Sequence, residues 1–151
     1  MLVSSAGIAK LTLPQATEKA ALAELDLGQD TARVSFERFD ETVSRIREFF
    51  RGKPVDFRDR LDLSAGTEFQ KKVWSSCRSI PYGQTRSYGW IAAQIGQPGA
   101  SRAVGNALSK NPIPIIIPCH RVLVADGGIG GFSGGLEVKR QLLKLEGIDV
   151  I

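Results

Sequence analysis

Hydrophobic and polar residues alternate in two stretches of the first third of the chain. One stretch runs from Ile8 to Leu13, and the other runs from Ala23 to Leu27, where Glu24 and Asp26 are the polar positions. A period of two is typical of strands with one buried face. Both stretches are therefore predicted to be strands.

A helical period follows these stretches. The apolar residues that would share one helix face are Phe39, Val43, Ile46 and Phe50. Asp40 is suited to cap the start of this helix, and Gly52 and Pro54 mark its end. The charged stretch from Lys53 to Ser64 is interpreted as a linker. It divides the chain into an N-terminal α/β lobe with linker, residues 1–62, and a C-terminal lobe, residues 63–151.

Thr67 opens a Thr-x-x-Gln capping box with Gln70, which predicts a helix to about Ser79. The apolar face of this helix comprises Phe69, Val73, Cys77 and Ile80. Cys77 is interpreted as a small buried apolar residue, because free cysteines are among the most buried residue types. The segment 81–83 is predicted to turn the chain.

Two short helices are predicted next, Ser87–Ile95 and Ser101–Lys110, joined by the turn Gly96–Ala100. Helix, tight turn and helix is the arrangement of helix-turn-helix DNA readers, and it is equally a common way to join any two helices. Around the long cation Arg102, the second helix carries the small residues Ser101, Ala103, Gly105 and Asn106. Such a surface suits close approach to a phosphate backbone or to another helix, and both interpretations stay open.

The segment after the second helix is broken by prolines. Asn111 ends the helix, and the prolines of NPIPIIIPC exclude a central strand. Residues 115–117 are expected to be buried. The glycine-dense loop DGGIGGFSGG lacks the spacing of nucleotide-binding loops. It is interpreted instead as backbone that presses against a flat ligand, with Phe132 and Ser133 as its functional side chains.

A last helix is predicted from Leu136 to Glu146, with Gly147 as its C-cap. A carboxylate in the last turn faces the negative end of the helix dipole, which is locally unfavourable. Glu146 is therefore either a tolerated surface residue or a functional one, because positions that break a local rule tend to be functional.

The only histidine, His120, directly follows Cys119 in the stretch IPCHRV. A reactive thiol needs a base or positive neighbours, and His120 and Arg121 offer both. Successive side chains of an extended segment point to opposite faces. Either the chain turns at Pro118 and Cys119, or the imidazole acts through a bridging water. Glu146 is the candidate carboxylate that would orient the imidazole.

Composition adds weaker constraints. The 151 residues, 42% of them hydrophobic, suffice for one compact domain or two small lobes. We expect a cytoplasmic, nucleoid-associated monomer, because there is no apolar run of membrane-spanning length, no signal peptide and no surplus apolar helix face. The net charge of +4 favours a polyanionic partner only slightly, because many ordinary proteins are equally basic. Two cysteines and one histidine do not make a usual zinc site, so no metal and no cofactor are expected.

The C-terminal motifs carry a resemblance to a known family. SRAVGNALSKNPIPIIIPCHRV and GGFSGGLEVKRQLLKLEG resemble the O6-alkylguanine-DNA alkyltransferases, which repair alkylated guanine. The similarity covers about Thr67 to Gly147, including FQKKVW and IPYGQTRSYGWIA, whereas residues 1–64 match loosely. It implies an α/β (α+β) fold: a small ribonuclease H-like N-terminal lobe, and a mostly helical, winged-helix-like C-terminal lobe with a helix-turn-helix.

The resemblance also implies catalytic roles. Cys119 would be the nucleophile that keeps the alkyl group, His120 its water-mediated base, and Glu146 the acid that orients His120. Tyr88 would give a proton or a hydrogen bond to the leaving guanine. Asn111 would be the hinge that ties the recognition helix to the cysteine loop.

Further roles concern DNA and the guanine pocket. Arg102 would be the arginine finger that fills the gap left in the base stack, and Arg121 would pair with acidic side chains. The residues implied at the DNA surface are Ser101, Ala103, Gly105 and Asn106. The residues implied at the substrate pocket are Val122, Phe132, Ser133 and Lys139, with Phe132 at a position where tyrosine is common.

The implied function is single-turnover repair of O6-alkylguanine in duplex DNA, with the damaged base flipped out through the minor groove. Alkyltransferase-like proteins, which carry tryptophan in place of the cysteine and only flag damage, are disfavoured because Cys119 is present. Two other classes remain as alternatives. A cysteine hydrolase would need an oxyanion hole, and a helix-turn-helix regulator would not need the thiol.

Overall fold

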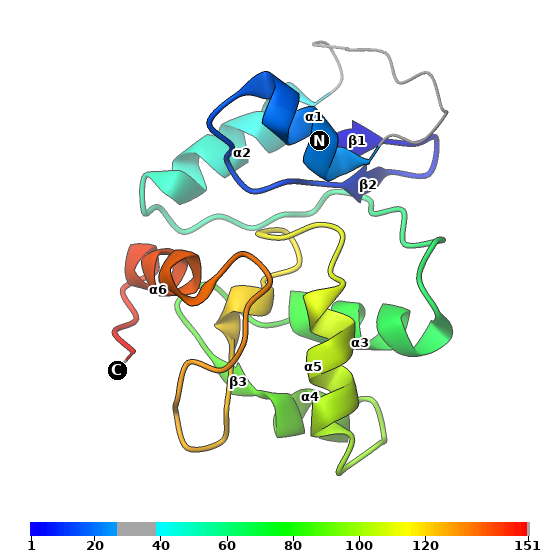
Figure 1. Cartoon of the computed structure of the whole chain (residues 1–151), viewed down its shortest axis with the longest axis vertical. Coiled ribbons are helices and arrows are strands. Elements are labelled where there is room, and N and C mark those ends of the chain that lie inside the picture. Colours follow the sequence, from blue (N-terminus) through cyan, green and yellow to red (C-terminus); the bar gives the residue numbers. More distant parts are fainter. Residues whose placement is uncertain (27–38, 151) are drawn as a thin grey trace.

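A computed structural model describes residues 1–26 and 39–150 as a mixed α/β fold (Figure 1). The N-terminal elements are β1 (Leu2–Val3), β2 (Ile8–Lys10), α1 (Glu18–Leu25) and α2 (Asp40–Phe50). The later elements are α3 (Glu68–Arg78), β3 (Arg86–Ser87), α4 (Tyr88–Gln94), α5 (Ser101–Ser109), a 3-10 turn at Cys119–Arg121, β4 (Val122–Leu123) and α6 (Leu136–Leu145). In Figure 1 the N-terminal elements lie above α3, α4 and α5, and the extended segment 53–64 runs between the two groups.

One of the two predicted strands is a helix. α1 covers Ala23 to Leu25, and the Thr17 side chain caps its start by accepting a hydrogen bond from the Ala20 N–H. The apparent alternation extends over too few residues to outweigh a capped run of alanine, glutamate, lysine and leucine, which are strong helix formers. Leu27 lies outside the described residues.

The other predicted strand is shorter than expected. β2 pairs antiparallel with β1 and ends at Lys10. Beyond it, the Leu11 N–H donates to the Pro112 carbonyl at 2.9 Å, so the chain leaves the sheet to contact the segment before the cysteine turn.

The helix predicted after residue 39 is present as α2, with two differences. Asp40 is its first residue rather than its cap, and Phe39 at the cap position makes no side-chain capping bond. The buried face also differs, because Phe49 is fully buried whereas Val43 is 36% exposed. Phe49 is drawn inward by aromatic partners from the C-terminal half, a contact that helical spacing alone does not reveal.

Segment 53–64 is held on both sides. The Ile8 N–H donates to the Arg60 carbonyl at 2.9 Å, and Ile8 accepts from the Asp62 N–H at 2.8 Å. On the other side, Arg78 donates to the carbonyls of Phe57 and Asp59. The segment is therefore fixed between β2 and α3, and the lobe boundary drawn through it stays a prediction.

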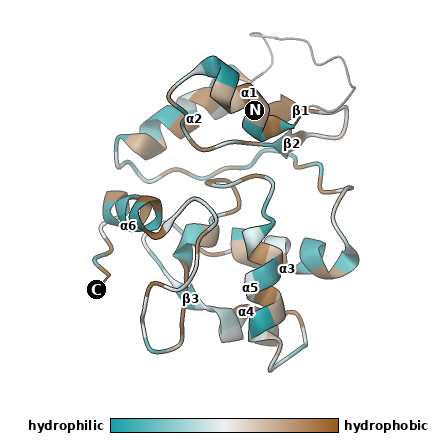
Figure 2. Cartoon of the chain, in the orientation of Figure 1, coloured by the Kyte–Doolittle hydropathy of each residue, from teal (hydrophilic) through white to brown (hydrophobic). Residues whose placement is uncertain are grey.

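The C-terminal helices follow the sequence closely. Thr67 and Gln70 form the expected reciprocal capping box at the start of α3. α3, α4 and α5 pack on one another, and the indole N–H of Trp74 on α3 donates to the Ala107 carbonyl on α5 at 2.9 Å. The predictions that Cys77 and residues 115–117 are buried are both confirmed. Figure 2 shows polar and apolar residues on each of these helices, as expected for helices that cover a core.

β3 and β4 bring the helix-turn-helix next to the cysteine turn. Their pairing is parallel, with Arg86 opposite Val122 and Ser87 opposite Leu123. β3 leads directly into α4, for which the Ser87 side chain is the N-cap. β4 directly follows the 3-10 turn. Two short strands thus set the start of α4 beside the residues after Cys119.

Candidate active site

Cys119 is the first residue of the 3-10 turn that ends at Arg121, and it is 6% exposed. The chain therefore turns at Cys119 instead of being extended, which was the first of the two alternatives drawn from the sequence. Successive side chains in a 3-10 turn do not point to opposite faces. The objection to Cys119 and His120 acting together therefore does not apply.

Asn111 binds the sulfur and its loop. Its Nδ2 donates to Cys119 Sγ at 3.1 Å and to the Ile117 carbonyl at 2.8 Å, and its Oδ1 accepts from the Ile113 N–H at 2.9 Å. Asn111 follows the end of α5 by two residues. Its side chain thus connects the end of the second helix of the helix-turn-helix with the thiol.

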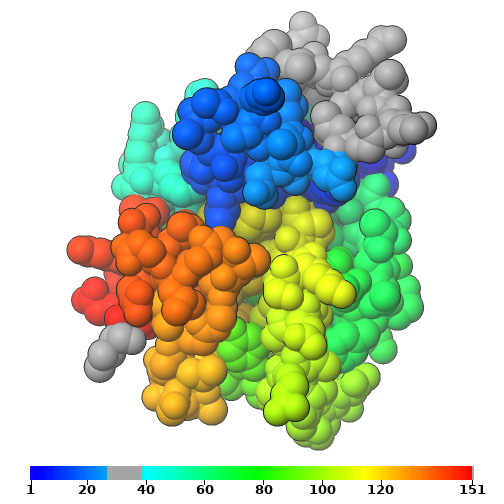
Figure 3. Space-filling model, in the orientation of Figure 1, coloured from blue at the N-terminus to red at the C-terminus, as the bar shows by residue number. Residues whose placement is uncertain are grey.

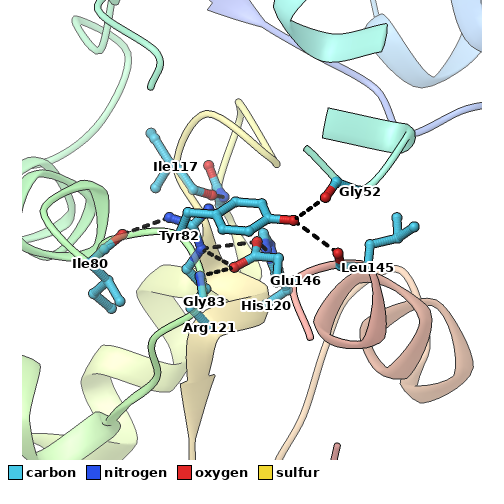
Figure 4. A network of polar contacts seen from close by, with 10 residues as sticks. Gly52, Ile80, Tyr82, Gly83, Ile117, His120, Arg121, Leu145 and Glu146 are labelled. Atoms are coloured by element: carbon cyan, nitrogen blue, oxygen red, sulfur yellow. Dashed lines mark hydrogen bonds and ion pairs between the residues drawn. The ribbon is translucent and has the colours of Figure 1, made fainter. Parts of the chain in front are cut away.

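Glu146 is the centre of a buried polar network (Figure 4). His120 Nε2 lies 2.7 Å from Glu146 Oε1, and Arg121 Nε donates to Glu146 Oε1 and Oε2 at 3.1 and 3.0 Å. The Gly83 N–H donates to Oε2 at 2.8 Å. These contacts explain a carboxylate at the unfavourable end of α6, where Glu146 is the C-cap residue and Gly147 follows with a φ of 76°.

The charges in this network are well defined. Burial favours a higher pKa for Glu146, but hydrogen bonds from His120, Arg121 and Gly83 outweigh it, so the net pKa is lowered and the group is a carboxylate. Burial lowers the pKa of His120, although Glu146 opposes this. A neutral His120 therefore donates through Nε2, and Nδ1 is left as the basic nitrogen. Nδ1 is buried and has no hydrogen-bond partner within residues 1–26 and 39–150.

The resting form of Cys119 is the thiol. Burial raises the pKa of Cys119, and the Asn111 hydrogen bond and the nearby charge of Lys139 offset this only in part. A nucleophilic sulfur therefore requires a base that removes its proton, and neutral His120 is suited to that task.

Tyr88 and Lys139 support the glycine-dense loop. The Tyr88 hydroxyl donates to the Gly131 carbonyl at 3.3 Å, and a Cβ added at Gly130 would lie 3.1 Å from the Tyr88 ring. Burial raises the pKa of Tyr88, and the nearby Cys119 raises it further, so the phenol keeps its proton. Lys139 is fully buried, and burial lowers its pKa to about 8.

Lys139 and Val122 were predicted to line the substrate pocket, and neither lines a cavity that borders Cys119. Lys139 Nζ instead donates to the carbonyls of Val122, Ile129 and Gly131 at 2.6, 2.6 and 3.2 Å. Both residues are fully buried, and the ammonium group supplies hydrogen bonds to backbone carbonyls inside the fold.

Two cavities border Cys119. The smaller, of about 460 Å³, lies between α5 and the glycine-dense loop, and its lining includes Tyr88, Ser101, Arg102 and Gly105. The larger, of about 780 Å³, lies towards the N-terminal segment. Phe132 and Ser133 line both cavities. Ala103 and Asn106 are exposed on α5 outside either lining.

Two contributors to the site were not identified from the sequence. The Tyr82 hydroxyl contacts the carbonyls of Gly52 and Leu145 at 3.0 and 2.9 Å, so it joins the ends of α2 and α6 next to Glu146 (Figure 4). Phe49 packs edge-on against the Tyr82 and His120 rings. Tyr82 was interpreted only as a turn residue, since an aromatic residue between proline and glycine gives no local sign of distant partners.

The described residues were also compared with the requirements of a membrane-spanning helix and of a metal site. Within residues 1–26 and 39–150, no helix has both the length and the apolar character that a bilayer crossing requires. The same residues bring together no group of three or more histidine, cysteine, aspartate or glutamate side chains that would hold a metal ion.

The fold and site define a helix-turn-helix domain whose second helix borders a buried cysteine with a histidine–glutamate pair beside it. A family model described as 6-O-methylguanine DNA methyltransferase, DNA binding domain, matches residues 68–148. The chain belongs to this family.

Individual relatives agree with the family match. The methylated-DNA–protein-cysteine methyltransferase of Mycobacterium leprae is 56% identical over 108 residues, which is 72% of this chain and 65% of that protein. The crystal structure of Mycobacterium tuberculosis O6-methylguanine methyltransferase matches with a TM-score of 0.67 at 51% identity, over 74% of this chain and 67% of that one. The structure of M. tuberculosis OGT in complex with DNA matches with a TM-score of 0.70 at 48% identity, over 78% and 75%. The chain thus spans about two thirds of the length of its curated relatives.

Replacing Glu146 by glutamine is expected to destabilise the protein by about 3 kcal/mol, because Arg121 is then left as a buried charge without its partner. The free energy of unfolding from urea denaturation measures the loss. Glu137→Gln is the matched control on the same helix, where the side chain is 74% exposed and a change below about 0.5 kcal/mol is expected. Equal losses in the two variants would contradict the importance of the network.

Acid is expected to destabilise the protein below about pH 6.5, the ordinary pKa of histidine. Because burial lowers the pKa of His120 in the folded state, the unfolded chain binds its proton first as the pH falls, and stability decreases. Unfolding free energies at pH 7 and pH 5.5 test this. His120 is the only histidine, so His120→Gln should be less stable at pH 7 but lose most of this pH dependence; an unchanged dependence would contradict the assignment.

Proposed function

We propose that this protein repairs O6-alkylguanine in duplex DNA by transferring the alkyl group irreversibly to its own Cys119, as a methylated-DNA–protein-cysteine methyltransferase. The observation that carries the proposal is the smaller cavity, which is lined both by Cys119 and by Ser101 and Arg102 from the second helix of the helix-turn-helix. A base entering from that helix would reach the sulfur directly.

The reaction is a displacement at the alkyl carbon. His120, oriented by Glu146, takes the proton of the Cys119 thiol through a bridging water, and the sulfur attacks the carbon attached to O6. The carbon–oxygen bond breaks as the carbon–sulfur bond forms, and the electron pair stays on guanine. Tyr88 donates a hydrogen bond or a proton to that guanine. The thiol proton held by His120 then passes to the guanine, or to Tyr88 if Tyr88 has given up its own proton. Overall, a thiol and alkylguanine become a thioether and guanine.

The thioether has no route back to the thiol. Dealkylation would require a nucleophile to attack the transferred carbon and expel the Cys119 thiolate, and the Cys119 neighbours described above offer no second nucleophile aimed at that carbon. We therefore propose one turnover per molecule. Cys77 has no part in this proposal, because it is fully buried and lines neither cavity that borders Cys119.

The helix-turn-helix would hold the DNA and flip the base. Extrusion of a nucleotide costs a few kcal/mol of stacking, and an inserted cation is one way to offset it. Arg102 is exposed and borders the cavity, which suits an arginine finger. Ser101, Ala103, Gly105 and Asn106 would form the small surface that approaches the minor groove, with Asn111 as the hinge.

Finer features complete the proposal. We propose a ribonuclease H-like lobe over residues 1–62, a winged-helix-like lobe over residues 63–151, and a monomer that works in the cytoplasm at the nucleoid without a cofactor. Phe132 and Ser133 form the wall shared by the two cavities and would contact guanine.

Incubation with a duplex containing O6-methylguanine is expected to add one methyl group to Cys119, located by intact mass and peptide fragmentation. Cys119→Ala should gain no mass, and Cys77→Ala, the matched control, should be methylated like the wild type. Turnover of esters would support a cysteine hydrolase instead. Tight binding of one operator sequence with no gain in mass would support a regulator.

Alkylation of Cys119 is expected to destabilise the protein, because the thioether weakens the Asn111 hydrogen bond to sulfur and crowds its loop. A loss of about 1 kcal/mol corresponds to a decrease of roughly 3 °C in the melting midpoint. Calorimetry of the protein before and after reaction measures it. Asn111→Ala lacks this bond from the start and should show a smaller decrease, whereas equal midpoints for the wild type before and after reaction would refute the idea.

A further inference from the structure

The proposed function assigns guanine to the cavity beside α5 and leaves most of the second cavity at Cys119 without a role. This second cavity is the larger of the two, at about 780 Å³, and Cys119, Phe132 and Ser133 connect it with the cavity beside α5. Its lining combines polar residues with apolar ones, and Leu13, Pro114 and Leu142 are among the apolar ones. A methyl group fills only a small part of such a volume.

The geometry of displacement directs larger substituents towards this cavity. Sulfur, the reacting carbon and O6 must lie nearly in line, so the rest of an alkyl chain projects sideways from that axis. If guanine occupies the cavity beside α5, the open space at the sulfur that remains is the larger cavity. This step rests on the proposed function.

The N-terminal segment forms the far wall of this cavity. Leu11 is fixed by the hydrogen bond from its N–H to the Pro112 carbonyl. Leu13, two residues later, approaches the glycine-dense loop so closely that a Cβ added at Gly134 would lie 2.8 Å from Leu13 Cδ1 and 2.9 Å from Phe132 Cε1. In Figure 3 the blue N-terminal part lies over the junction of the yellow and orange parts of the chain.

From these contacts we infer that Leu13 determines which alkyl groups this protein accepts. Its side chain, packed against the loop that carries Phe132 and Ser133, limits the space for apolar O6 substituents longer than methyl. The N-terminal segment thus selects the adduct, although the reacting groups all come from the C-terminal half.

Rates of transfer from two duplexes of identical sequence, one with O6-methylguanine and one with O6-butylguanine, test this inference. Leu13→Trp fills the cavity and is expected to lower the butyl-to-methyl rate ratio about tenfold or more, with the methyl rate within about threefold of wild type. Leu13→Ala removes volume and is expected to raise the ratio. Leu22→Trp is the matched control, since Leu22 on α1 is 41% exposed and does not line the cavity.

The outcomes separate this inference from the proposed function. If the wild-type protein transfers no methyl group from O6-methylguanine, the proposed function itself is refuted. Methyl transfer that persists in both Leu13 variants with ratios within twofold of wild type would overturn the role of Leu13 alone. If Leu13→Trp does not fold, as its melting curve would show, the ratio for Leu13→Ala decides in the same way.

Discussion

The structure around Cys119 depends on one buried carboxylate. A charge in the interior is tolerated only when its hydrogen-bonding capacity is met, and Glu146 meets this condition with donors from His120, Arg121 and the Gly83 backbone. These donors come from the cysteine turn and from the turn after α3, while the carboxylate comes from the end of α6. Arg121 extends the network by donating to the Ile80 carbonyl at 2.6 Å. A single ionised group therefore fixes three segments that are distant in the sequence.

The N-terminal elements contribute to this chemistry indirectly. Phe49 of α2 covers the His120 ring, with ring centroids 5.9 Å apart, and Tyr82 holds the ends of α2 and α6 together. Burial, to which Phe49 contributes, lowers the pKa of His120 and favours the neutral imidazole, which is the form that accepts a proton. A loosely matching N-terminal sequence is compatible with this role, because covering and shaping require volume more than particular functional groups.

Much of the C-terminal half could be predicted from the sequence, because its signals are local. A capping box, two short helices and prolines act within a few residues, and Glu146 was noticeable because it broke a local rule. The errors have a different origin. The segment Ala23–Leu25 was too short for its period to be decisive, and the inward face of α2 depends on partners from the C-terminal half. Likewise, Tyr82 contacts a carbonyl 63 residues away, and Leu13 meets a loop from the opposite end of the chain.

Lys139 has one consequence for how this pocket could change during evolution. The ammonium group of Lys139, on α6, holds main-chain oxygens at Val122, Ile129 and Gly131, so these contacts do not depend on the identity of the side chains at those positions. Mutations at outward-facing loop positions could accumulate and remodel the ligand surface while the scaffold beneath them persists. The shape of the pocket could in this way change without a change in the contacts around Cys119.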